Sequence, residues 1–379
     1  MNTTAERAST APKIARLQAI MESKQLDAVV VCSYQNVSYF GGTYLMSMVA
    51  VPDRMAFLVV PRGKEPTLVV CGIETRQVLS QTDIKDVRDY VEFADNPTEM
   101  MARVLAERGL ISGSIGVDAR RLPLASGDLI REKLRGAELV PIDDEIELAQ
   151  SVKDRSEIDI LEQAANATLA AAEETAAELP PGSTERQFST SVFLKLGQKG
   201  GAPLFLVFAA GERTMQGHPE STDRQLQPGE LWRIDFGARF HEVINSDLAR
   251  TGVTGEPSAE QQATLKALRA TQDAGFRAIE PGRPAREVFE AVKHEFKRQG
   301  MPFSMPHIGH GMGIAVHEFP MLQPRCDIAL QVGMVLNIEP MVVLEDRQEA
   351  YHTEDLAEVT QDGARLLTKP QESLLRVRA

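Results

Sequence analysis

The chain has 379 residues, a formal net charge of −13, and 43% hydrophobic and 5% aromatic residues, a composition typical of soluble globular proteins. At about 100–200 residues per domain, this length predicts two domains that each bury their own core. An acidic chain without a basic cluster excludes broad phosphate-backbone binding. No apolar run approaches the ~20 residues that cross a bilayer. We therefore expect neither nucleic acid nor membrane as a partner and, because Met1 to Lys13 lacks the apolar core of a secretory signal, a cytoplasmic protein.

The first 150 residues alternate between strand-like and helix-like stretches, which is typical of an α/β domain. Short runs rich in β-branched residues predict buried strands at residues 26–32, 55–60, 67–70 and 114–118. Apolar residues at helical spacing predict helices at residues 13–24 and 97–108.

The sequence changes character near residue 150, after the acidic stretch 143–145, and we place a domain boundary there. A long Ala- and Glu-rich helix is predicted over residues 156–179, with Ser156 and Asp159 as its capping box. Further helix starts are predicted at the capping boxes Thr184–Gln187 and Ser258–Gln261, and at Pro284, whose helix would run to about Gly300. Strands are expected to fill most of the remainder.

The three cysteines, Cys32, Cys71 and Cys326, are too widely spaced for a disulfide framework or a CxxC metal knuckle. We expect them to be small buried apolar residues.

All seven histidines follow residue 217, and five short segments in the same part of the chain place acids or an imidazole among apolar or small residues. The segments are 234–237, 245–247, 309–313, 337–340 and 353–355, and each contains an acid or an imidazole. Burying a lone carboxylate is costly unless it is paired or binds a metal. Any one of these acids is more often a surface charge, but four carboxylates with one imidazole together suit a pair of divalent cations. Two cations about 3.5–4 Å apart are a known hydrolytic arrangement.

The order Asp, Asp, His, Glu, Glu, in IDFG, NSD, GHGMGIAVHEFP, NIEP and TEDLAEVT, closely resembles the pita-bread metallopeptidase superfamily of methionine aminopeptidase, aminopeptidase P, prolidase and creatinase. The resemblance covers nearly the whole chain. Residues 16–42, ending in NVSYFGG, are similar to the amino-terminal domain that creatinase, prolidase and aminopeptidase P share, and residues 151–158 to the junction that follows it. Methionine aminopeptidases generally lack that domain, which disfavours them.

This resemblance implies an α/β creatinase-like domain at residues 1–150 and a pita-bread catalytic domain at residues 151–379, with a curved antiparallel sheet backed by helices. It also implies a homodimer whose amino-terminal domain closes the partner's active site. Two divalent metal ions are expected as cofactors: manganese first, with cobalt, zinc or iron as alternatives. Carried over by motif, Asp235 would chelate one metal, Asp247 and Glu354 would bridge both, and His310 with Glu339 would complete the second site.

The resemblance further implies catalytic roles for three residues. His218 and His317 would face the substrate without binding metal. Glu339 would accept a proton from the water that bridges the metals, and the hydroxide left behind would be the nucleophile. A structural histidine is the alternative at either position. His307 is a candidate substrate-binding residue, although its family counterpart usually lies one residue upstream, where this chain has Pro306. The remaining histidines, His241 and His294, are expected to face solvent.

Two positions depart from the family pattern. Asp235 and Asp247 are twelve positions apart, one more than expected, which predicts an extra residue or a bulge in the connecting hairpin. His352 stands where prolidases and aminopeptidases P usually have arginine, two residues before the final glutamate. We expect it to contact substrate, but an imidazole cannot hold a carboxylate bidentately as a guanidinium does.

Three functions remain open. The favoured one is metal-dependent hydrolysis of short peptides with proline after the scissile bond, as in prolidase or aminopeptidase P. The second is an enzyme on a small non-peptide metabolite, since relatives of this fold include creatinase and a dimethylsulfoniopropionate lyase. The third is a non-catalytic binding protein, which the complete ligand set disfavours.

Overall fold

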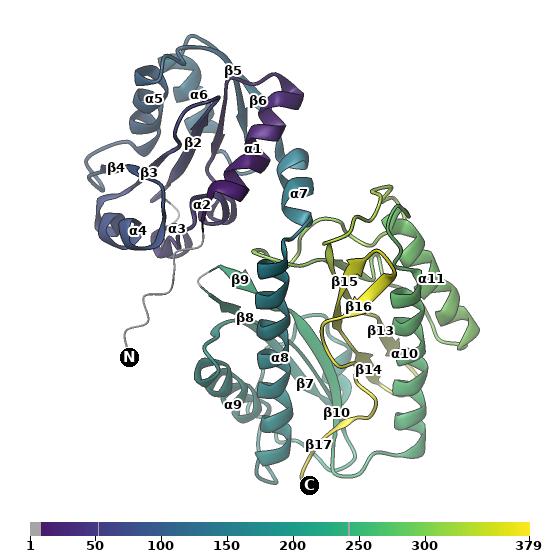
Figure 1. The fold of residues 1–379 in the computed structure, drawn as a ribbon. Coiled ribbons are helices and arrows are strands. Elements are labelled where there is room, and N and C mark those ends of the chain that lie inside the picture. The colour runs from purple at the N-terminus through teal and green to yellow at the C-terminus, as the bar shows by residue number, and fades with distance from the viewer. Residues whose placement is uncertain (1–8, 52, 242) are drawn as a thin grey trace. The chain divides into compact units, whose positions relative to one another are not determined.

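A computed structural model describes residues 9–51, 53–241 and 243–379 (Figure 1). The chain divides into two compact units, one up to Gln150 and the other from Ser151. In the part of the chain that the structure describes, no helix combines the length and apolar character needed to cross a membrane.

The N-terminal unit is built on one six-stranded sheet with the order β4-β3-β2-β1-β5-β6 (Figure 1). Strand β2 pairs antiparallel with β1 and β3, and the other neighbours are parallel. The strands are β1 (Ala28–Val31), β2 (Phe57–Pro61), β3 (Thr67–Cys71), β4 (Asp86–Tyr90), β5 (Ser112–Val117) and β6 (Gly136–Pro141). The helices are α1 (Ala11–Lys24), α2 (Tyr34–Gly41), α3 (Met46–Ala50), α4 (Thr75–Gln81), α5 (Pro97–Glu107), α6 (Leu124–Lys133) and α7 (Asp143–Ser151), with a short η1 (Gly72–Glu74).

The predicted α/β pattern of this unit is confirmed, although the bounds of the helices and strands differ from those predicted. The four predicted strands are β1, β2, β3 and β5, and the two predicted helices are α1 and α5. Residues of β1, β2, β3 and β5 share one apolar core with α5 and α6. The central strands read as continuous apolar runs because both of their faces are buried. Cys32, Cys71 and Cys326 are buried free thiols, as predicted.

The C-terminal unit contains two larger, mainly antiparallel sheets and a small hairpin, with the orders β17-β10-β8-β7, β11-β12-β15-β16 and β13-β14. Strand β9 also pairs with β8 in the first sheet, and the pairing of β10 with β17 in that sheet is parallel. The first sheet comprises β7 (Ala202–Ala210), β8 (Leu231–Phe240), β9 (Ile244–Asn245), β10 (Leu248–Thr254) and β17 (Leu375–Val377). The others comprise β11 (Gly309–Gly311), β12 (Val335–Ile338), β13 (Met341–Leu344), β14 (Glu349–His352), β15 (Asp355–Thr360) and β16 (Gly363–Leu366).

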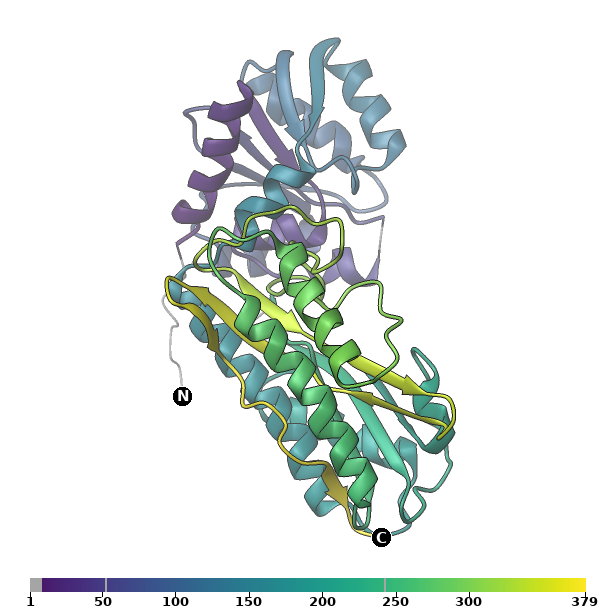
Figure 2. The same ribbon diagram turned by 90° about the vertical axis from the view of Figure 1, so that its right-hand side faces the viewer.

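Four long helices back these sheets, as expected for the catalytic domain. They are α8 (Arg155–Glu178), α9 (Glu185–Gln198), α10 (Ala259–Ala278) and α11 (Ala285–Arg298), with a short η2 (Gly211–Met215) after β7. Helices α10 and α11 lie side by side in Figure 2, and their apolar residues share a core with β12 and β15. The predicted capping boxes at Thr184 and Ser258 are confirmed as the starts of α9 and α10.

The predicted starts of two helices are wrong by one or two residues. Asp154, not Ser156, caps α8: its side chain accepts from the Glu157 backbone N–H, and the Glu157 carboxylate accepts from the Asp154 backbone N–H. Asp154 has the extended conformation that a capping residue needs, whereas Ser156 already lies in the first turn. Pro284 is likewise the N-cap of α11 rather than its first helical residue.

The only tryptophan in the sequence, Trp232, is fully buried on β8. Its indole packs 5.0 Å from the Phe188 ring of α9, which itself stacks on Phe208 of β7 at 4.1 Å. A Cβ on Gly252 of β10 would lie 2.0 Å from the indole, so a glycine is required opposite it. This aromatic cluster fixes β8 against α9 three residues before Asp235.

Candidate metal centre

Strand pairing in the C-terminal unit brings distant acids together. Asp235 lies in β8, and Asp247 directly precedes β10, which pairs with β8. His310 lies in β11, and Glu339 directly follows the neighbouring β12. Glu354 connects the two sheets, since it lies between β14 and β15 and its backbone N–H donates to the Ala249 carbonyl of β10 at 3.1 Å.

All five residues predicted as metal ligands meet at this junction. Potential ligand atoms lie within 4.8 Å of one another in three groups: Asp235, Asp247 and Glu354; His310, Glu339 and Glu354; and Asp247, His310 and His317. The His310 Nε2 atom is central: it lies 3.6 Å from carboxylate oxygens of Asp247 and Glu339, and 3.8 Å from one of Glu354.

Buried atoms at the centre of this cluster lack hydrogen-bond partners among the described residues. They include His310 Nε2, Asp247 Oδ1 and Glu354 Oε2. The His310 Nδ1 atom lies 3.0 Å from the Gly311 carbonyl, which can only accept, so Nδ1 carries the proton. Nε2 therefore presents a lone pair to three carboxylates. Such a set of buried ligand atoms without hydrogen-bond partners fits divalent cations, and a hydrogen bond made by the other ring nitrogen is typical of a metal-binding histidine.

The acids of the cluster differ in their protonation. Burial, together with the neighbouring carboxylates, raises the pKa of Asp247 and of Glu354 well above the ordinary range, and burial also raises the pKa of Asp235. Burial opposes ionisation of Glu339 too, but the neighbouring imidazoles of His307 and His352 outweigh it and hold its pKa low. Burial lowers the pKa of His310 to about 4, so its imidazole is neutral near pH 7.

Two further histidines flank Glu339. His307 Nδ1 lies 3.2 Å from Glu339 Oε1, and this contact outweighs burial and raises the pKa of His307. His352 is buried, with its Nε2 atom 3.8 Å from Glu339 Oε2. His307 and His352, the two residues predicted to bind substrate, thus both lie next to Glu339, the carboxylate predicted to move the proton.

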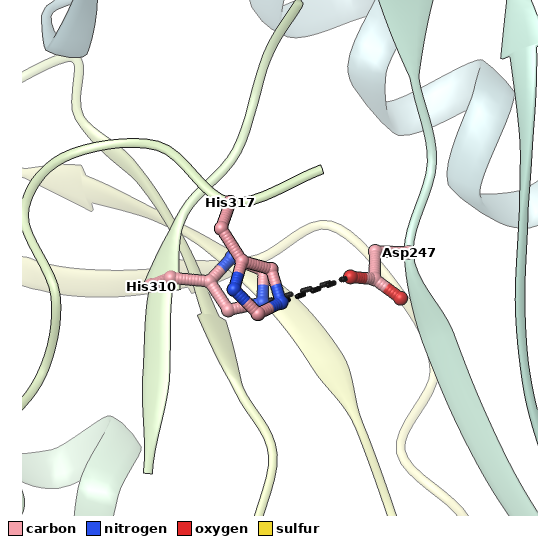
Figure 3. A group of neighbouring side chains, drawn as sticks. All are labelled: Asp247, His310 and His317. Atoms are coloured by element: carbon pink, nitrogen blue, oxygen red, sulfur yellow. Dashed lines mark ion pairs between the residues drawn. The ribbon is translucent and has the colours of Figure 1, made fainter. Parts of the chain in front are cut away.

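The two histidines predicted to be catalytic lie at exposed edges of the cluster. The His317 side chain is half-exposed at 50%, its ring stacks on His310 at 4.0 Å, and its Nε2 atom lies 3.9 Å from Asp247 Oδ2 (Figure 3). His218 is exposed on the turn after η2, and its charge acts to lower the pKa of Asp235. His241 and His294 are exposed, as expected.

The paired strand residues that the structure describes between Asp235 and Asp247 contain no bulge, so that part of the expectation is wrong. Phe236 pairs with Leu248 and Phe240 with Ile244 in one unbroken register. His241 adopts a positive φ of 43°, which lets a short turn join the strands. The register shift in this sheet lies instead between β7 and β8, at Pro203 to Phe205.

Several buried polar residues that support the cluster were not identified from the sequence. Asn337 Nδ2 donates to the Glu354 carboxylate and, at 2.9 Å, to the Asp247 carbonyl. Arg250 donates to the Glu354 carbonyl and pairs with Asp355, each at 2.7 Å. The available signal was their position, since Asn337 and Asp355 lie within two residues of predicted ligands.

Comparisons with known proteins indicate one family. Residues 159–361 match the model of metallopeptidase family M24, and residues 13–151 match the creatinase/prolidase N-terminal domain. The Xaa-Pro dipeptidase of Pyrococcus furiosus is 27% identical over 96% of this chain and 99% of its own length. The probable dipeptidase PepE of Mycobacterium tuberculosis is 29% identical over 82% of this chain and 83% of its own.

Solved structures also match across both units. The prolidase from Pyrococcus horikoshii has a TM-score of 0.81 and 26% identity, with 96% of this chain and 99% of that chain covered. Since the M24 match spans more than half of the chain and contains every residue of the acid and histidine cluster, we conclude that this protein belongs to metallopeptidase family M24 and carries the creatinase/prolidase N-terminal domain.

Proposed function

We propose that this metallopeptidase hydrolyses the bond before proline in short peptides, with a dipeptide as its preferred substrate. The observation that carries the proposal is the position of His310 Nε2, which faces three carboxylates at 3.6–3.8 Å. The peptide class is suggested by relatives named Xaa-Pro dipeptidase and prolidase, which align over nearly the whole chain.

Two divalent cations fit the cluster. Asp235, Asp247 and Glu354 would hold one cation, and His310, Glu339 and Glu354 would hold the other. Glu354 would thus serve both cations, and so would Asp247, which also lies close to His310. Such ions act as Lewis acids and lower the pKa of water towards neutrality. Mixed oxygen and nitrogen ligands accept several transition metals, and we propose manganese as the first to test.

The remaining groups supply proton transfer and hydrogen bonds. The low pKa of Glu339 keeps its carboxylate ionised, so Oε1 can accept the proton of the attacking water and pass it to the leaving prolyl nitrogen. His317 and His218 lie on exposed edges and can donate to the oxyanion that develops on the scissile carbonyl. His307 and His352 orient Glu339 from either side.

The test compares Ala-Pro with Ala-Pro-Ala, using metal-stripped enzyme with and without manganese, cobalt or zinc. We expect metal-dependent cleavage of Ala-Pro; cleavage of the tripeptide alone would instead indicate an aminopeptidase. Ala-Ala controls for selectivity. His294→Ala, at an exposed histidine of α11, is the matched control for substitutions of the site histidines.

His352 supports a second candidate function on a small non-peptide metabolite. It replaces the arginine that the prolidase pattern would place beside the final glutamate, and its buried ring reaches Glu339 rather than presenting a fixed charge to a substrate carboxylate. Two bound metals without cleavage of either peptide would favour this candidate. Gain of dipeptidase activity by His352→Arg would show that this position selects the substrate.

A further inference from the structure

A buried ion pair lies beside the candidate metal centre, although its members are separated by 165 residues in the sequence. Lys153 Nζ donates to Glu318 Oε2 at 2.7 Å, and the two side chains are only 5% and 9% exposed. Lysine and glutamate are rarely buried to this extent without a specific partner. Neither residue belongs to the ligand cluster, so the pair requires another explanation.

The second oxygen of Glu318 organises the loop that precedes it. Oε1 accepts from the backbone N–H groups of Ile314 and Ala315, at 2.6 and 3.1 Å. The backbone of Glu318 also exchanges hydrogen bonds with Gly311, at 2.9 and 3.0 Å. The backbone of residues 311–318 therefore folds around the carboxylate of Glu318, the last residue of this loop.

Two other contacts hold the same loop. A Cβ on Gly313 would lie 2.6 Å from both carboxylate oxygens of Glu318, so only glycine allows the backbone to approach so closely. On the other side, Asn245 donates from its backbone to the Gly313 carbonyl at 2.8 Å and from Nδ2 to the Ile314 carbonyl at 2.9 Å. The loop is thus held between the Glu318 carboxylate and the segment that contains Asp247.

His317 is the residue this loop presents to the cluster. Its ring lies 4.0 Å from the ring of His310, and its Nε2 atom reaches within 3.9 Å of Asp247 (Figure 3). Because the side chain is half-exposed, its place depends on the backbone that carries it. A displacement of about 1 Å in a group that contacts substrate can cost on the order of 100-fold in rate.

We propose that Glu318, anchored by Lys153, is a positioning residue that shapes the 311–318 loop and thereby sets His317 at the metal centre. The catalytic consequence rests on the proposed function, whereas the loop geometry does not. The carboxylate joins two backbone N–H groups to a buried cation, so the loss of either charge frees the loop.

The first measurement is hydrogen exchange at the Ile314 and Ala315 amides in metal-free protein. Lys153→Met and Glu318→Gln should each lower their protection about tenfold or more, and Lys153→Arg should retain most of it. Lys195→Met is the matched control, because Lys195 pairs with the exposed Glu178 in the same unit. Unchanged protection in both Lys153→Met and the near-isosteric Glu318→Gln would overturn the proposal.

The second measurement is a double-mutant cycle with His317→Ala. Lys153→Met should lower kcat about 100-fold with metal content and KM little changed, and should have little further effect in the His317→Ala background. Equal effects in both backgrounds would refute the link to His317. If the wild type cleaves no Xaa-Pro peptide while exchange behaves as expected, the proposed function fails and the role of Glu318 in the loop stands.

Discussion

Asp247 and Glu354 are the residues whose burial is hardest to account for in this protein without a bound cation. Both are almost fully buried, and each has an oxygen that accepts no hydrogen bond from the described residues. An uncompensated buried carboxylate is costly, and the raised pKa of each acid expresses that cost. A cation removes the penalty, so these two side chains should depend on metal more than any others in the cluster.

Removal of either carboxylate should abolish both metal binding and turnover. We expect Asp247→Ala and Glu354→Ala to lose bound metal, measured by elemental analysis, and to lower hydrolysis by at least about 10⁴-fold, since neither cation would then keep its shared ligands. Asp273→Ala is the control, because that acid pairs with Arg269 on α10. Full activity with retained metal in either ligand variant would refute the assignment of the centre.

Metal affinity should weaken as the pH falls. Because their pKa values are raised, Asp247 and Glu354 hold protons that a cation must displace. Each proton released strengthens binding by about tenfold per unit increase in pH, at pH values below the raised pKa. Calorimetric titration in two buffers of different ionisation enthalpy measures the release directly. Binding without proton release would contradict the raised pKa values.

At the level of secondary-structure elements, β8 does more than hold Asp235. Arg233, two residues earlier on the same face, is 1% exposed and donates to three backbone carbonyls, those of Thr214, Gln216 and Gly217. Burial lowers the pKa of Arg233, with Asp235 acting in the opposite direction. The guanidinium thereby fixes the turn that carries His218.

Arg233→Met should release this turn. Three backbone carbonyls would lose their donor, and the bond to the Thr214 carbonyl is buried. At about 1–3 kcal/mol for a buried group left unsatisfied, we expect the free energy of unfolding to fall by about 1–3 kcal/mol in urea titrations. The rate should fall through misplacement of His218 while metal content is kept. Arg283→Met, at an exposed arginine beside Glu280, provides the comparison. Equal stability of the two variants would count against this role for β8.

Elements with local signals were predictable from the sequence, and those set by distant contacts were not. Thr184 and Ser258 were identified as caps because a capping box lies within four residues, whereas the Asp154 cap was missed because Ser156 offers a similar pattern nearby. The metal cluster was predictable because its residues lie in recognisable motifs. The Lys153–Glu318 pair has no such signal, since only the tertiary fold joins residues so far apart.

At the scale of the whole molecule, the residues of the site all belong to the C-terminal unit, and the six-stranded sheet of the N-terminal unit contributes none of them. The two units have separate cores. Ligand binding stabilises the cooperative unit that holds the ligand.

Added metal should therefore raise the melting temperature of one unit and not the other. At 100 times its Kd, a cation stabilises the folded state by about 2.7 kcal/mol, which corresponds to about 5–10 °C for a unit of this size. Differential scanning calorimetry of stripped and reloaded protein should show a shift in the C-terminal transition alone. Asp247→Ala should show no shift, and a parallel shift of both transitions would contradict the separation.

The aromatic cluster of Trp232, Phe188 and Phe208 also equips the molecule with an optical reporter. Selective excitation of the single indole observes β8 and its surroundings only, because the N-terminal unit contains no tryptophan. Emission from this buried indole should lie at short wavelength and move towards the red when water reaches it. Circular dichroism records both units, so the difference between the two signals isolates the unfolding of the N-terminal unit without a label or a truncation.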